Sequence, residues 1–141
     1  MPFLDERTRD QARNRLADLA SPVRLVFFER ALGCETCPEA RSVAQEVAGL
    51  SDKITFEAYN VVTDREKARE FRVEDAPVLV VAGRKDHGIR FYGAPTGYEF
   101  GALLETIRDV SEQIPKLEAA TLEALGGVNT PVHLRVFVTP T

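Results

Sequence analysis

The chain is 141 residues long, with 44% apolar and 28% charged residues, a net charge of −4 and a pI near 5.3. This length and apolar content suit one domain with a substantial hydrophobic core. The acidic balance lacks the basic footprint of nucleic-acid-binding proteins, and no apolar run approaches the roughly 20 residues that a membrane-spanning helix needs. The first 20 residues also lack an apolar secretory signal, so we expect a cytoplasmic protein that binds neither nucleic acid nor membranes.

The first half of the chain predicts two helix–strand units. Residues 4–20 show helical periodicity, and their apolar face consists of Ala12, Leu16, Leu19 and Ala20. Residues 23–28 form an apolar run typical of a buried strand. A second helical stripe runs over 39–48, and the alternation over 53–59 predicts a second strand.

The next segment predicts a helix, a hairpin and a longer helix. A capping box of Thr63 and Glu66 opens a short helix that runs to Phe71. Residues 78–82 are a buried strand, and residues 89–92 return as its hairpin partner. A second capping box, formed by Thr96 and Glu99, opens the long helix that follows.

This order of elements predicts an α/β fold. A right-handed crossover through a helix makes the first two strands parallel, and the hairpin adds an antiparallel pair. We therefore expect a mixed four-stranded sheet covered by helices on both faces, formed by residues 1–114.

The C-terminal residues 115–141 predict a further helix over 118–126 and a strand over 132–138. The segments 21–27 and 130–137 share a proline, a following valine, a leucine and a late phenylalanine, each after a helix. We interpret this as an internal repeat whose second copy is incomplete, with chance similarity as the alternative. A partnerless apolar strand is a template for pairing, so we expect 132–138 to join a sheet edge of its own domain or of a second copy in a homodimer.

The two cysteines, Cys34 and Cys37, lie where a strand and a loop lead into a helix. The free N–H groups and the dipole at a helix start stabilise a thiolate, which favours Cys34 as the attacking thiol. Cys37, one turn further on, suits the resolving role in thiol–disulfide exchange. Glu35 opposes a negative charge on Cys34, so we expect a middling to reducing potential.

These features resemble the thioredoxin superfamily, through Cys34-x-x-Cys37 at a helix start, the isolated Ala76–Pro77 before a strand, and the hairpin and helix that follow. The resemblance is closer to the glutaredoxin-like protein disulfide oxidoreductases of thermophiles, which carry two thioredoxin units in tandem. That family has a second cysteine pair after the second such strand, where this sequence stops. Arginine outnumbers lysine by 14 to 4, which fits a thermophilic or a GC-rich source.

The resemblance implies both a function and two further site residues. It implies a thiol–disulfide oxidoreductase that acts on protein dithiols and disulfides, needs no cofactor and takes electrons from a reductase. It also implies a cis Ala76–Pro77 bond facing the cysteine pair, with Ala76 hydrogen-bonding an extended substrate segment. Without the resemblance, a trans bond is the default for such a proline.

Other interpretations of these residues stay open. The chain could be a redox-inactive binding module, or the cysteine pair could be inert or half of a metal site bridged by a dimer. The only histidines available to a metal are His87 and His133. Glu29 and Glu57 could accept the proton of the resolving thiol, although each is more simply interpreted as a solvated residue. The charged helix over 65–70 is most simply a solvated face.

Overall fold

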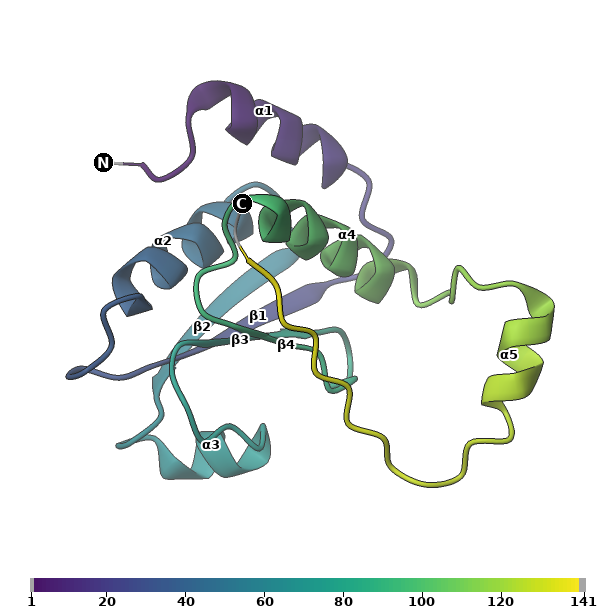
Figure 1. Cartoon of the computed structure of the whole chain (residues 1–141). Helices are drawn as coiled ribbons and strands as arrows, with labels where there is room; N and C mark the ends of the chain where they lie inside the picture. Colours follow the sequence, from purple (N-terminus) through teal and green to yellow (C-terminus); the bar gives the residue numbers. More distant parts are fainter. Residues whose placement is uncertain (1, 140–141) are drawn as a thin grey trace.

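The computed structural model describes residues 2–139 (Figure 1). The elements, in chain order, are α1 (Glu6–Arg15), β1 (Val23–Glu29), α2 (Cys37–Ala48), β2 (Ile54–Asn60), α3 (Arg65–Glu70), β3 (Val78–Ala82), β4 (Arg90–Tyr92), α4 (Tyr98–Glu112) and α5 (Ala119–Leu125). The predicted order of helices and strands is confirmed as far as α5.

The four strands form one mixed sheet in the order β2-β1-β3-β4, as the sequence predicted. Strands β1 and β2 are parallel, while β3 is antiparallel to both β1 and β4. The register pairs Phe28 with Val78 and Glu29 with Asn60. The loops after β1 and β2 and the segment before β3 therefore meet at one end of the sheet, and the turn 83–88 lies at the other end.

The sheet is covered unequally on its two faces. Helices α1, α2 and α4 lie over one face, and the short α3 lies over the other (Figure 1). The larger core includes Leu16, Leu25, Phe27, Val43, Val47, Leu79, Leu103 and Ile107. The smaller core includes Val26, Phe28, Ala68, Phe71, Val78 and Val80. Strand β1 supplies side chains to both cores, which explains its nearly continuous apolar sequence.

Helix boundaries differ from the predictions at three places. Helix α1 ends at Arg15, not near residue 20, because the chain must turn there to enter β1; Ala20 is consequently exposed. Helices α3 and α4 begin at Arg65 and Tyr98 without a side-chain cap, so neither predicted capping box forms.

The predicted strand over 132–138 is wrong for this structure. Within the described tail, residues 131–139 have no regular secondary structure; α5 lies away from the sheet, and the chain after it turns back across the view (Figure 1). Five large apolar side chains there are exposed, namely Val132, Leu134, Val136, Phe137 and Val138. A strand requires hydrogen bonds to a neighbouring strand, and this segment pairs with none of the four strands of the sheet. Residues 140–141 lie outside the described part.

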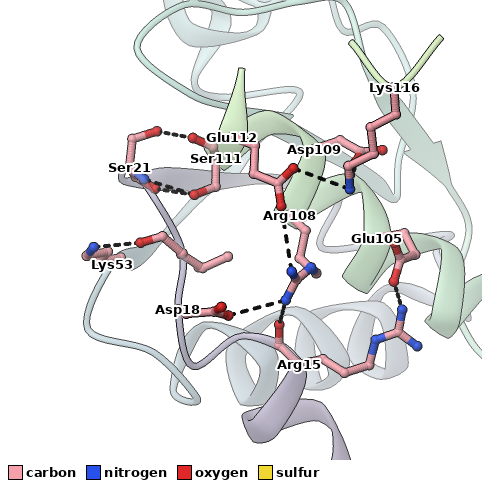
Figure 2. Close-up of polar contacts among 11 residues, drawn as sticks. Arg15, Asp18, Ser21, Lys53, Glu105, Arg108, Asp109, Ser111, Glu112 and Lys116 are labelled. Carbon is pink, nitrogen blue, oxygen red and sulfur yellow. Dashed lines mark hydrogen bonds and ion pairs between the residues drawn. The ribbon is translucent and has the colours of Figure 1, made fainter. Parts of the chain in front are cut away.

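A set of polar contacts joins the segment before β1 to α4 (Figure 2). The backbone N–H of Ser21 donates to Ser111 Oγ at 2.9 Å, and that hydroxyl donates to the Ser21 carbonyl at 2.9 Å. Arg108 donates to the Arg15 carbonyl and lies 3.4 Å from Asp18. Ser111 is only 2% exposed, so its hydroxyl satisfies backbone groups that water reaches poorly.

We expect Ser111→Ala to lower the free energy of unfolding by about 1–2 kcal/mol, because it leaves the Ser21 N–H and carbonyl without this partner. Urea unfolding followed by far-UV circular dichroism measures the change. The control is Ser42→Ala, which removes a hydroxyl bonded only to the Pro38 carbonyl of its own helix. Equal loss of stability in both variants would contradict the role assigned to Ser111.

Candidate functional site

The cysteine pair stands at the junction of the central strand and α2. After β1, Gly33 adopts φ +71°, a left-handed conformation that favours glycine, and turns the chain towards the helix. Cys34 precedes the helix and Cys37 is its first residue. Pro38 follows at a position where the helix needs no N–H donor. The pair forms a disulfide with a Cα–Cα distance of 5.4 Å.

The two sulfur-bearing residues differ in exposure. Cys34 is half-buried, whereas Cys37 is only 4% exposed. An incoming partner therefore reaches Cys34 first, while Cys37 is shielded by the helix start. This asymmetry is the one that a disulfide-exchange pair requires, with an accessible attacking thiol and a sheltered resolving thiol.

The Ala76–Pro77 bond is cis, as the resemblance implied. Pro77 is buried, and its carbonyl accepts a hydrogen bond from the N–H of Gly93 at 3.2 Å. Ala76 is half-buried, and its N–H donates to the carboxylate of Asp75 at 2.9 Å. Since β1 and β3 are antiparallel neighbours, this segment and the cysteine loop lie at the same end of the sheet. That Pro77 faces the Cys34 sulfur stays a prediction.

An ion pair connects the two loops of the site. The guanidinium of Arg30, in the loop before Cys34, lies 3.7 Å from the carboxylate of Asp75, directly before Ala76. Sequence reasoning missed this contact, because the two residues are far apart in the chain and only the strand register brings them together.

Glu29 and Glu57, which the sequence suggested as proton acceptors for the resolving thiol, are both paired with arginines. Glu29 is ion-paired with Arg41 of α2. Glu57 accepts hydrogen bonds from Arg24 at 2.9 and 3.2 Å and from the Tyr59 hydroxyl at 3.0 Å. The hydrogen bond from Arg24 lowers the pKa of Glu57 against the opposing effect of burial, so this carboxylate is a weak proton acceptor.

Among residues 2–139, no three His, Cys, Asp or Glu side chains come together as a ligand set. His87 lies in the 83–88 turn, at the end of the sheet opposite to the cysteines.

In the described part of the chain, residues 2–139, no helix has the length and apolar character needed to cross a membrane.

The fold and the cysteine pair together define a thioredoxin-fold protein. No protein-family model matches the sequence. A thioredoxin of Methanocaldococcus jannaschii is 34% identical over 89 residues, which are 62% of this chain and 95% of that protein. The chain belongs to the thioredoxin superfamily.

Two solved structures extend the match beyond a single unit. A protein disulfide oxidoreductase from Aeropyrum pernix superposes with a TM-score of 0.78 at 32% identity, over 89% of this chain and 56% of that one. The N-terminal domain of the alkylhydroperoxide reductase AhpF from Enterococcus faecalis gives a TM-score of 0.76 at 29% identity, over 86% and 59%. The chain thus spans little more than half of these relatives, and the predicted resemblance to the tandem-unit type is confirmed. With the disulfide, these relationships support a thiol–disulfide oxidoreductase.

In the reduced protein, we expect Cys34 to react with limiting iodoacetamide before Cys37, because Cys34 is the more accessible sulfur and lies at the N-terminal end of α2. Peptide mass spectrometry after a timed quench measures the labelling of each residue. Equal labelling, or faster labelling of Cys37, would contradict the assigned order.

Proposed function

We propose that this protein exchanges disulfides with protein substrates through Cys34 and Cys37. The observation that carries the proposal is the unequal exposure of a cysteine pair at the start of α2, at the sheet end that also holds the cis Ala76–Pro77 bond. Membership of the thioredoxin superfamily supports it.

In the reducing direction, the thiolate of Cys34 attacks one sulfur of a substrate disulfide. That disulfide breaks, a mixed disulfide forms, and the other substrate sulfur leaves as a thiolate. The thiolate of Cys37 then attacks Cys34, which releases the second substrate sulfur and leaves the Cys34–Cys37 disulfide. Two electrons pass to the substrate, and a dithiol is oxidised in the protein; the oxidising direction is the reverse.

We propose that Ala76 and Pro77 hold the substrate chain during this exchange. Ala76 is half-buried, whereas Pro77, on the other side of the cis bond, is buried. An extended substrate segment would pair with the backbone of Ala76 and displace the Asp75 carboxylate from the Ala76 N–H, leaving Arg30 as the neighbour of Asp75.

The electron donor is proposed to be a reductase, in keeping with a glutaredoxin-like oxidoreductase. An alkyl hydroperoxide reductase protein of Staphylococcus epidermidis is 35% identical over 117 residues, or 82% of this chain and 21% of that protein. The similarity to one segment of a much longer reductase supports a partner of this kind.

Reduction of insulin disulfides by dithiothreitol tests the proposed exchange. We expect Cys34→Ser to reduce catalysis to the uncatalysed background, because the attacking thiolate is gone. Cys37→Ser should instead accumulate a mixed disulfide with its substrate, visible by non-reducing electrophoresis and mass spectrometry. If wild type and Cys34→Ser give the same rate, the protein is a binding module whose cysteines are incidental.

We also propose that residues 132–138 complete a sheet in a homodimer. Their five large apolar side chains are exposed, up to 90% for Phe137, and strand β2 is an open sheet edge of seven residues. An apolar segment beside an open edge favours strand addition between two copies.

Light scattering tests the dimer, for which we expect twice the chain mass of 15.6 kDa. The variant Leu134→Asp/Val136→Asp should be monomeric, because it places charges on the alternate positions that strand addition would bury. The control His133→Asp/Arg135→Asp charges the opposite alternate positions and should stay dimeric. A monomeric wild-type chain would contradict the proposal.

A further inference from the structure

An open pocket of about 630 Å³ lies between α3 and the loops at the cysteine end of the sheet. Four arginines line it, namely Arg30, Arg65, Arg69 and Arg72, around an apolar floor that includes Val61 and Val73. The volume is within the range of roughly 300–1,000 Å³ that ligand pockets show.

The pocket adjoins the proposed exchange site through two of its walls. Arg30 belongs to the loop that leads to Cys34, and Glu74 is separated from Ala76 only by Asp75. The Arg30–Asp75 ion pair joins these two walls. A substrate chain held along Ala76 would therefore pass close to the pocket.

Glu74 also lines the pocket and Arg30 is paired with Asp75, but the other three arginines have no acidic partner among the described residues. In the described chain, no acidic side chain pairs with Arg69 or Arg72, and Arg65 donates only to the Val62 carbonyl, at 3.3 Å. Glu70 does not compensate them, since it pairs with Lys67 at 2.9 Å. The chain as a whole carries a net charge of −4, so a cluster of four arginines runs against its overall composition.

The backbone of Arg72 is strained. Arg72 follows α3 with φ +54°, in the left-handed region where glycine is favoured at helix ends. The turn is closed by the N–H of Val73, which donates to the Ala68 carbonyl at 2.8 Å. Glycine would adopt this backbone with less strain, so the arginine costs backbone energy here, as Gln113 does at the end of α4 with φ +58°.

We propose that this pocket binds an acidic segment of the protein whose disulfide is exchanged at Cys34. The planar guanidinium groups would bind glutamate or aspartate carboxylates, and the apolar floor would accept an apolar side chain between them. The inference rests on the proposed function and adds a substrate preference to it. It replaces the simpler interpretation of 65–70 as a solvated face.

Two self-quenched fluorescent disulfide peptides, identical except for flanking Glu or Gln residues, test the preference. At low salt, we expect the reduced protein to react about tenfold faster with the Glu peptide, as two exposed ion pairs together would give. The preference should fall towards unity in about 1 M NaCl, where charges are screened. The preference for the Glu peptide should also fall towards unity in the double variant Arg69→Ala/Arg72→Gly. The control Arg84→Ala, at the opposite end of the sheet, should retain the preference.

Equal wild-type rates for the two peptides, or the same loss of preference in Arg84→Ala, would overturn the proposal. Fluorescence anisotropy of a Glu peptide with serines in place of cysteines tests binding to the oxidised protein without any reaction. If neither disulfide peptide reacts, the proposed exchange fails, and the anisotropy measurement still decides the pocket. Saturation by inorganic phosphate without binding of the Glu peptide would make the pocket a small-anion site and overturn the proposal.

The single variant Arg72→Gly separates function from stability. We expect it to raise Tm by roughly 3 °C, since glycine adopts this backbone without strain, and at the same time to weaken binding of the Glu peptide. A lower Tm together with unchanged binding would mean that Arg72 serves the fold alone, and would overturn its assigned role.

Discussion

The antiparallel pairing of β1 with β3 is the constraint on which the site depends. Its register sets Phe28 opposite Val78, which fixes the end of β1 beside the start of β3. The cysteine loop follows the first strand and Ala76–Pro77 precedes the second, so one set of backbone hydrogen bonds brings together residues about 40 positions apart. A shift of one residue would turn every side chain of β1 to the opposite core, which is why this register is strongly specified.

The unequal covering of the sheet by helices explains where charged side chains lie against it. Three helices close one face, but the short α3 covers only part of the other, and there the central strand carries a charged residue, Arg24. Its guanidinium is held by Glu57 of β2 and lies 5.6 Å from the ring centre of Phe71. The same incomplete cover leaves the space between α3 and the loops that forms the arginine-lined pocket.

The sequence predicted those features that local patterns specify. Periodicity identified the helices and the four strands, and the spacing of Cys34 and Cys37 identified the pair; the cis bond at Pro77 came from the resemblance. Helix ends were less predictable, because α1 stops where the path into β1 requires it and not where its apolar stripe stops. The Arg30–Asp75 pair and the meeting of four arginines could not be predicted, because they follow from strand register and not from any spacing in the chain.

The C-terminal tail also shows that a strand depends on its neighbouring strands. Residues 132–138 have an alternating apolar pattern much like that of a real strand, and they follow the proline and begin with the valine that also open β1. In β1, the backbone groups of these positions bond to β2 on one side and β3 on the other. The tail pairs with neither edge strand of the sheet, β2 or β4, and its pattern alone does not provide the hydrogen bonds that hold a strand. Alternation specifies which face a strand will bury, whereas a partner decides whether the strand exists, and this is why an alternating pattern gives a strand at β2 and none at 132–138.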